Sequence, residues 1–373
     1  MREFNSDGMY LKHINLINFK NYDQAEFSLE SGVNCFVGRN GIGKTNVLDA
    51  VHYLSMCKSY LNPIDKQNIR FEEKFFVVQG QWDVEGDEVE IYCAVKAGEK
   101  KVVKRNKVTY EKLGDHIGEF PSVIISPYDR DLISEGSESR RRWVDGIISQ
   151  FDREYLYSLV KYNKVLDQRN MLLKQFYENG FFERESIEVW DIQLEAIGNE
   201  IYQKRISFLE EFIPTFQYYY EFIGNETEHV KLEYKSQLND ALFTDLLIQN
   251  LKKDSFSGYT NAGIHKDDFV FLINDHLVKK FGSQGQQKSF VIALRLAQFD
   301  WLKKQLNKKP ILLLDDIFDK LDNHRVEKLM KLVSDNVFGQ VLVTDTDKER
   351  VATIFNRISM DYKLFDMVEL MEK

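Results

Sequence analysis

The segment Gly38-Arg39-Asn40-Gly41-Ile42-Gly43-Lys44-Thr45 fits the phosphate-binding loop pattern G-x-x-x-x-G-K-[ST] at every position. The apolar run 33–37 before it reads as a short buried strand, and residues 46–54 after it read as a helix. In this strand–loop–helix context the glycines let successive backbone N–H groups turn toward a triphosphate, and the helix N-terminus adds its positive end. We therefore expect Lys44 to reach the β- and γ-phosphates of ATP and the Thr45 hydroxyl to hold Mg²⁺.

A second nucleotide-binding element lies near the end of the chain. The four apolar residues 311–314 predict a buried parallel strand, and Asp315 and Asp316 follow it directly. Carboxylates at the C-terminal end of such a strand lie where ligands bind in parallel sheets. We expect Asp315 to organise Mg²⁺ or its water, and Asp316 to orient or deprotonate the attacking water as a catalytic residue. The alternative, a strand that ends in a helix N-cap aspartate, is disfavoured by the phosphate loop in the same chain.

The third element is the signature segment Ser283-Gln284-Gly285-Gln286-Gln287, which stands at the start of a long predicted helix. A serine, a glycine and glutamines at a helix start can bind an anion through a hydroxyl, backbone N–H groups and the helix dipole. One phosphate loop already holds one side of a triphosphate, so a second cradle is useful if it caps the γ-phosphate of a nucleotide bound to another copy. The alternative interpretation of this short pattern is a plain helix N-cap.

The composition limits the class of protein. With 373 residues, 43% hydrophobic and 29% charged, the chain reads as a soluble globular protein of one large domain with insertions or of two to three lobes. We expect a cytoplasmic protein, because no apolar run approaches the roughly 20 residues of a membrane span and three cysteines without metal spacing fit a reducing compartment. The net charge of −9 argues against wholesale wrapping of nucleic acid, but it leaves room for local basic faces such as 100–107 and 140–142.

The remaining segments predict an α/β fold with two additions. Alternating apolar and polar residues between about 75 and 110 predict an inserted antiparallel sheet. Helical periodicity over 137–213 predicts two amphipathic helices in a coiled-coil-like antiparallel hairpin, with ordinary core helices as the alternative. After Pro214 strands alternate with helices, which predicts a parallel sheet. The expected domains are a nucleotide-binding head formed by 1–136 and 214–373, and a helical lobe formed by 137–213.

The order of these motifs resembles the ABC ATPase head of SMC-type proteins and, within that group, the RecF family. The glutamine-rich signature segment and an arginine triplet set RecF-like proteins apart from other ABC ATPases. The matching segments span about residues 9–344 and are Asn18–Tyr22, the phosphate loop with Asn46, Lys58–Tyr60, Ser126-Pro127, Arg140–Asp145, Gly263–Asp268, Gly282–Lys288 and Leu314–Asp316.

The resemblance implies an ABC-type ATPase head that forms a homodimer on ATP and binds DNA without sequence preference. RecF-like proteins act at single-strand gaps with the RecO and RecR proteins, help to load recombinase, and are linked to replication and the SOS response. Their ATP hydrolysis is slow and resets the dimer. By motif match, Ser283, Gly285 and Gln286, with Gln287 beside them, would meet the γ-phosphate of the partner's ATP. Asp319 would belong to the loop that crosses the dimer interface.

Three features depart from the family pattern. Ile264 and Lys266 stand where the family usually has proline and arginine, and Thr344-Asp345 lies where many ABC ATPases carry a γ-phosphate-sensing histidine. Residues 1–8 precede the usual start. Three other classes of protein compete with this interpretation: an ABC transporter motor subunit, a P-loop kinase, and a protein that uses ATP as a structural switch without useful hydrolysis. A transporter motor would carry L-S-G-G-Q, and a kinase would need an acceptor site and a lid.

Overall fold

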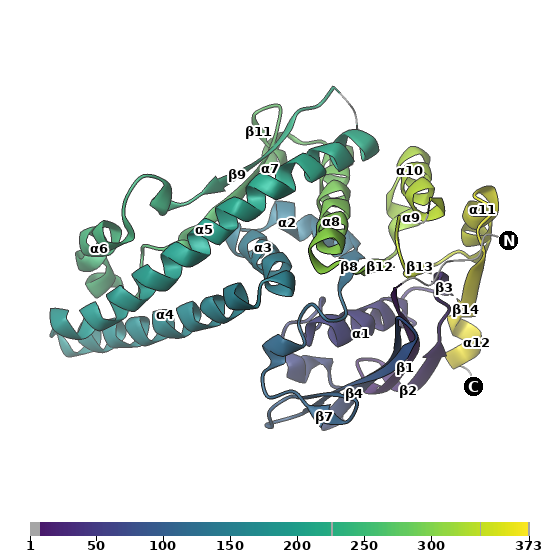
Figure 1. Cartoon of the computed structure of the whole chain (residues 1–373), viewed down its shortest axis with the longest axis horizontal. Helices are drawn as coiled ribbons and strands as arrows, with labels where there is room; N and C mark the ends of the chain where they lie inside the picture. Colours follow the sequence, from purple (N-terminus) through teal and green to yellow (C-terminus); the bar gives the residue numbers. More distant parts are fainter. Residues whose placement is uncertain (1–7, 225–226, 336, 372–373) are drawn as a thin grey trace. The chain divides into compact units, whose positions relative to one another are not determined.

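The computed structural model of the chain describes residues 8–224, 227–335 and 337–371, except for the side chains of residues 319, 320 and 371. The chain forms two compact units, each built from separate parts of the sequence. We call Met1–Arg130, Tyr219–Asn225 and Lys288–Lys373 the nucleotide unit. Asp131–Tyr218 and Glu226–Gln287 form the helical unit, which is mainly teal and green in Figure 1.

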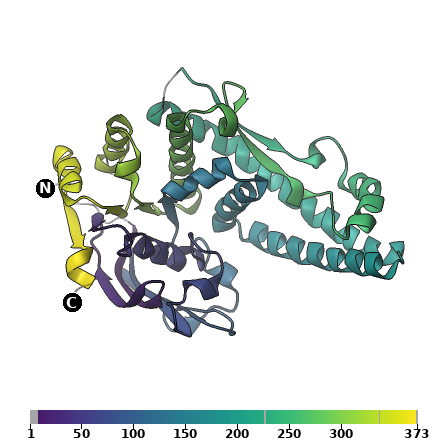
Figure 2. The ribbon, with the colours of Figure 1, turned by 180° about the vertical axis from the view of Figure 1, so that it is seen from behind.

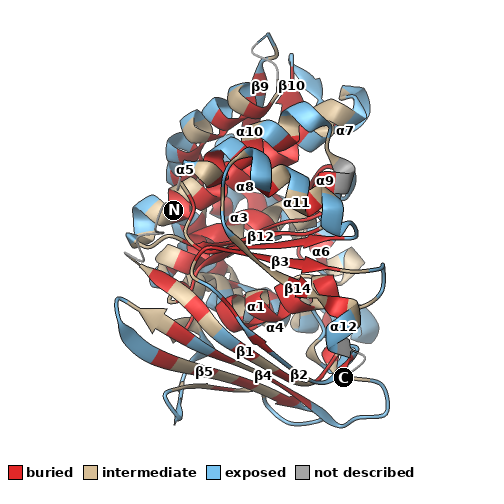
Figure 3. Ribbon diagram, turned by 90° about the vertical axis from the view of Figure 1, so that its right-hand side faces the viewer, coloured by how far each residue is buried: buried red, intermediate tan, exposed pale blue. Residues whose placement is uncertain are grey.

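A five-stranded parallel sheet forms the centre of the nucleotide unit. Its strand order is β14 (Tyr362–Asp366), β3 (Val33–Val37), β13 (Val341–Asp345), β12 (Ile311–Leu314) and β8 (Ser122–Ile125). Strands β3, β12, β13 and β8 are buried along their whole length, because helices and a second sheet cover both faces (Figure 3). All neighbours pair in parallel, so the strands end at one common edge. The segments that follow them therefore lie close together.

A six-stranded antiparallel sheet forms the other layer of this unit. Its order is β2 (Tyr22–Ser28), β1 (Met9–Phe19), β4 (Phe75–Val84), β5 (Asp87–Lys96), β6 (Val102–Arg105) and β7 (Val108–Thr109). The predicted insertion over 75–110 thus pairs with the predicted N-terminal hairpin in one sheet. Helix α1 (Lys44–Met56) lies between the two sheets (Figures 1 and 2), and the ring of its Tyr53 packs edge to face against the rings of Phe19 and Phe76 from the antiparallel sheet.

The other helices of the nucleotide unit belong to the C-terminal half of the chain. They include the C-terminal part of α8 (Gln284–Leu306), α9 (Ile317–Lys320), α10 (Asn323–Ser334), α11 (Lys348–Arg357) and α12 (Met367–Met371). Within the described part of the chain, no helix combines the length and the apolar character needed to cross a membrane.

The helical unit is dominated by two long antiparallel helices, α4 (Arg153–Asn179) and α5 (Arg184–Ile223). Residue numbers rise along α4 as they fall along α5: Lys204 pairs with Asp152 at 2.7 Å, and Arg169 pairs with Asp191 at 2.6 Å. The unit also contains α2 (Asp131–Ser134), α3 (Ser137–Phe151), α6 (Phe243–Ser257), α7 (Val278–Phe281), and a small antiparallel sheet of β9 (Val230–Lys235), β10 (Asp268–Ile273) and β11 (His276–Leu277).

Two boundaries differ from the prediction. Helix α5 continues through Pro214 to Ile223, so the predicted end at residue 213 is wrong. Proline costs a helix interior roughly 3 kcal/mol, and burial of the large rings of Phe212 and Phe216 on either side offsets that cost. Residues 226–287, expected in the head, group instead with the helices, because Asp268 of β10 binds Arg140 of α3 within the helical unit.

Candidate nucleotide-binding site

The phosphate loop joins β3 to α1 in a conformation that depends on glycine. Gly41 and Gly43 have φ of 80° and 114°, and Gly43 is the N-cap of α1. A Cβ on Gly43 would stand 2.7 Å from both Asn21 Nδ2 and Tyr22 Oη, closer than any ordinary contact. The buried Lys44 ammonium donates to the Gly38 and Arg39 carbonyls at 2.8 and 3.2 Å. The loop therefore holds its own lysine within the segment predicted to bind phosphates.

The buried carboxylate of Asp315 binds residues from the ends of two neighbouring strands and from the start of α1. Its side chain is 2% exposed and accepts hydrogen bonds from Thr45 Oγ1 at 2.7 Å, Thr344 Oγ1 at 2.9 Å and Ser126 Oγ at 3.2 Å. The structure thus brings together Thr45 and Asp315, the two predicted Mg²⁺ ligands, although 270 positions separate them. A hydroxyl and a carboxylate side by side fit Mg²⁺, which takes one or two protein oxygens and fills its shell with water and phosphate oxygens.

Asp316 occupies a strained position next to this carboxylate. It has φ of 45° at the start of α9, a conformation that costs a non-glycine residue free energy. Its N–H donates to Thr344 Oγ1 at 2.9 Å, the same hydroxyl that binds Asp315. The backbone thus turns away from the strand at Asp316. The role of Asp316 in activating water stays a prediction.

Residues Asn21 and Tyr22, which follow β1, form hydrogen bonds that hold the phosphate loop in place. The sequence analysis did not assign this role to them. Asn21 Nδ2 donates to the Ile42 carbonyl at 3.1 Å, and Asn46 Nδ2 donates to Asn21 Oδ1 at 2.6 Å. Tyr22 Oη donates to the Gly43 carbonyl at 3.0 Å. The sequence did show polar residues at the end of an apolar strand, but it did not show that these residues contact the phosphate loop.

Asp49 of α1 was also missed as a supporting residue. Its carboxylate is fully buried and accepts from Lys20 Nζ at 2.5 Å, Ser59 Oγ at 2.6 Å and the Tyr60 N–H at 2.6 Å. Two segments quoted for the family resemblance, 18–22 and 58–60, therefore meet at one acidic side chain. This contact fixes the helix that carries Lys44 and Thr45.

A buried ion pair connects α8 to the same region. Arg295 Nε donates to Asp129 Oδ1 at 3.1 Å, and Asp129 Oδ2 accepts from the Ser126 N–H at 2.9 Å. Tyr60 Oη also donates to Asp129. Burial alone would lower the pKa of Arg295, but Asp129 and Tyr60 raise it above its ordinary value. Arg295 therefore stays charged, and Ser126 links this pair to Asp315.

The signature segment caps its own helix in the isolated chain. The Gln286 N–H donates to Ser283 Oγ at 3.2 Å, and the Ser283 N–H donates to Gln286 Oε1 at 2.7 Å, which is a reciprocal capping box. Gln287 Nε2 donates to the Gly282 carbonyl at 3.1 Å. With Gly285, these residues belong to the helical unit, whereas the phosphate loop and the carboxylates belong to the nucleotide unit. Asp319 falls in α9, and its side chain lies outside the described residues.

The two basic faces are partly neutralised inside their own units. Arg140 forms a bidentate pair with Asp268 at 2.8 and 3.0 Å, and Arg141 donates to the Asp267 carbonyl at 2.5 Å. Both arginines thus anchor α3 to β10, whereas Arg142 is exposed. In the other face, Lys101 pairs with Asp65 at 2.8 Å.

Comparisons with known proteins give one consistent result. The model of the "RecF/RecN/SMC N terminal domain" family matches residues 10–364. "DNA replication and repair protein RecF" of Flavobacterium johnsoniae is 50% identical over 359 residues, which cover 96% of this chain and 100% of the relative. The protein of the same name from Phocaeicola vulgatus is 48% identical and covers 96% of both chains.

Solved structures agree with the sequence comparisons. The recombination mediator protein RecF-ATP in the RecFOR pathway superposes with a TM-score of 0.86 at 30% identity, over 94% of this chain and 95% of that chain. The Smc head domain of Pyrococcus furiosus, with an extended coiled coil, has a TM-score of 0.52 at 17% identity and shares the fold, over 92% of this chain and 91% of that chain. The predicted fold class, an ATPase head with an antiparallel sheet and a lobe of long helices, is confirmed.

Proposed function

Because this chain belongs to the RecF family of SMC-type ATPases, we propose that it is an ATP-dependent DNA-binding protein of recombinational repair. In this proposal ATP and Mg²⁺ drive a cytoplasmic homodimer onto DNA at single-strand gaps. There it works with RecR and RecO proteins to help load recombinase, in support of replication and the SOS response. The names of the related proteins from Flavobacterium johnsoniae and Phocaeicola vulgatus, and the structural similarity to RecF-ATP in the RecFOR pathway, support this function.

One observation carries the nucleotide part of the proposal: the two nucleotide motifs meet at a single buried carboxylate. The backbone N–H groups of 38–45 and the Lys44 ammonium would bind the phosphates, and Thr45 with Asp315 would hold Mg²⁺, which neutralises phosphate charge when bound. Asp316 would orient the attacking water. Hydrolysis is slow in this proposal, and its role is to release the dimer.

The dimer completes the site in this proposal. Ser283, Gly285, Gln286 and Gln287 of one copy would bind the γ-phosphate held by the other copy, and Asp319 would lie at the crossing between them. The exposed Ser283 hydroxyl at the N-terminus of a 23-residue helix supports this role, and phosphate binding would release the Gln286 N–H that the capping box occupies in the isolated chain. Nucleotide then stabilises the dimer by mass action, since it binds the closed pair better than the separate chains.

Sedimentation velocity with and without ATP·Mg²⁺ and duplex DNA tests the proposal. We expect the wild-type chain to shift from monomer to dimer with ATP, and Lys44→Met to remain monomeric with an unchanged fold. Lys74→Met is the matched control, because Lys74 is an exposed lysine of the same unit that lies outside the nucleotide motifs. A Lys44→Met protein that still dimerises with ATP would refute the mechanism.

A further inference from the structure

Three large aromatic side chains lie exposed near one another at the end of the helical unit. Phe256, on the last turn of α6, is 81% exposed, Tyr177 on α4 is 60% exposed, and Tyr259 after α6 is 49% exposed. The rings of Tyr177 and Phe256 are 6.5 Å apart. Apolar groups gathered on a surface in this way commonly mark a binding site.

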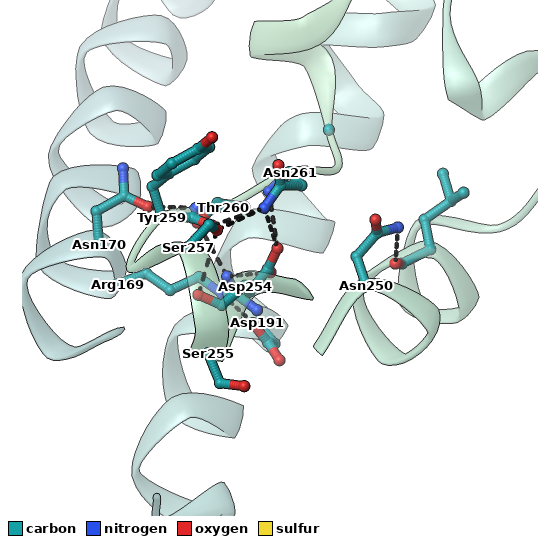
Figure 4. A network of polar contacts seen from close by, with 12 residues as sticks. Arg169, Asn170, Asp191, Asn250, Asp254, Ser255, Ser257, Tyr259, Thr260 and Asn261 are labelled. Carbon is teal, nitrogen blue, oxygen red and sulfur yellow. Dashed lines mark hydrogen bonds and ion pairs between the residues drawn. The ribbon is translucent and has the colours of Figure 1, made fainter. Parts of the chain in front are cut away.

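A buried polar network fixes the loop that carries Tyr259 (Figure 4). Arg169 is fully buried and donates to Asp254 at 2.7 Å and to Thr260 Oγ1 at 2.9 Å. Asp254 in turn accepts from the Asn261 N–H at 2.9 Å. A buried ion pair is poor evidence of stabilisation, but it does fix geometry. The loop is therefore ordered before any ligand arrives, so binding costs little conformational entropy.

A cation lies against one of these rings. The Lys266 ammonium lies 5.4 Å from the Tyr259 ring centroid. Burial, Arg141 and Lys253 all lower the pKa of Lys266. The carboxylate that opposes this effect, Asp254, is already bound to Arg169. The cations thus repel one another, and a bound anion would relieve that repulsion.

Helix α4 also contributes a lysine. A Cβ on Gly258, the C-cap of α6, would stand 3.7 Å from the Cα of Lys174. Lys174 is one helical turn from Tyr177, so the two side chains share a face of α4. Helices α4 and α6 and the segment after α6 therefore each carry a lysine and an aromatic ring.

We propose that this tip surface binds single-stranded nucleic acid. Its residues are Lys174, Tyr177, Lys253, Phe256, Tyr259 and Lys266. The lysines would contact phosphates, and unpaired bases would stack on the rings, which accept any base. A duplex keeps its base faces inside the stack and so gains nothing from the rings. A protein segment would use the rings but would not need the crowded lysines. The inference rests on the proposed DNA-binding function, and it gives a role to Lys266, which departs from the family pattern.

Fluorescence anisotropy on the full-length chain with ATP·Mg²⁺ tests the surface. The probes are a labelled oligothymidylate of about 20 nucleotides, longer than one typical binding site, and a duplex of equal length. We expect Phe256→Ala and Tyr259→Ala each to weaken oligothymidylate binding about tenfold, and to change duplex binding less than twofold. Lys266→Glu should weaken oligothymidylate binding and reduce the slope of log affinity against log salt concentration by about 0.7.

Matched controls lie on the same helix. Tyr157→Ala and Lys161→Glu change an exposed tyrosine and an exposed lysine of α4 that stand four residues apart, and should leave both affinities unchanged. Circular dichroism melting shows that each variant folds. Sedimentation with ATP on the same samples measures dimer formation separately, so a failure of the proposed dimer is distinguished from a failure of the tip surface.

Three results would overturn the inference. The first is wild-type affinity for oligothymidylate in the aromatic variants. The second is an equal loss of duplex binding, which would indicate a general basic face. The third is normal oligothymidylate binding together with lost co-sedimentation with RecR or RecO protein, which would assign the surface to a protein partner.

Discussion

Replacement of Arg295 by methionine is a direct test of how the nucleotide unit is held together. Arg295 lies on α8 and donates to Asp129 and, at 2.8 Å, to Gln298 Oε1. Methionine fills a similar volume without charge. The variant therefore leaves the Asp129 carboxylate, whose side chain is 0% exposed, without its cationic partner. Among the described residues, Tyr60 and the Ser126 N–H still donate to it.

The expected cost follows from that geometry. Removal of one partner from a buried ion pair costs about 3–5 kcal/mol, because the remaining charge is buried without compensation. For a unit of this size each kcal/mol shifts the melting temperature by roughly 2–4 °C, so we expect a fall of about 6–20 °C. Asp129→Asn in the same chain removes the second charge but keeps an acceptor for the Ser126 N–H, and should restore about half of the loss.

Calorimetry of the single and double variants measures this coupling. Arg357→Met is the matched control, because Arg357 and its partner Glu327 are exposed in the same unit and lie 3.9 Å apart. Loss of that pair should change stability by less than about 1 kcal/mol. If Arg295→Met melts within 2 °C of the wild type, or if the double variant is less stable than the single one, the buried pair does not act as the geometry implies.

Three further predictions concern the two units. Asp316→Asn should trap the ATP-bound dimer, and subunit exchange as fast as wild type in excess ATP would exclude Asp316 as the water-activating group. Gly43→Ala should weaken ATP binding at least tenfold in calorimetric titration, because the new Cβ would meet Asn21 and Tyr22 at 2.7 Å; Gly86→Ala, which also has positive φ but open space around it, should bind ATP normally. Burial lowers the pKa of His265 from 6.5 to about 4. Between pH 6.5 and 4, His265 is protonated in the unfolded chain but neutral in the folded chain. The contribution of His265 to the free energy of unfolding therefore falls by about 3 kcal/mol as the pH drops from 6.5 to 4. Urea unfolding of His265→Gln should show a shallower pH slope, and an identical slope would contradict this assignment.

The nucleotide motifs were predictable because their chemistry is local. The sequence 38–45 defines its own loop, and four apolar residues before Asp315 define a buried strand, so both appear in the structure at the predicted positions. The meeting of Thr45 and Asp315 followed from a general rule on parallel strands. The antiparallel strands were also visible, since one exposed face imposes a period of two.

The missed features depend on contacts between distant segments. Asp49 reads as an ordinary polar residue of an amphipathic helix, and only the fold brings Lys20 and Ser59 to it. Strand β14 has one buried residue in five, so no alternation marks it. Pro214 predicts a helix end by local chemistry, but packing of the rings around it overrides that preference. Local rules thus failed where tertiary burial supplied the larger free energy.

The Arg295–Asp129 pair also lies between the signature segment and the proposed Mg²⁺ site at Asp315. Helix α8 begins at the signature segment and carries Arg295, which binds Asp129; Asp129 holds the Ser126 N–H, and Ser126 Oγ donates to Asp315. Contacts in series do not by themselves establish coupling, because transmission requires an element with two arrangements. The double variant Asp129→Asn/Arg295→Met, which recovers part of the lost stability, tests whether the pair is only structural or also couples α8 to Asp315. If it folds well and its dimer yield responds to ATP like the wild type, the pair is structural only. A folded double variant that binds ATP but no longer dimerises would instead locate the coupling between α8 and Asp315 in this pair.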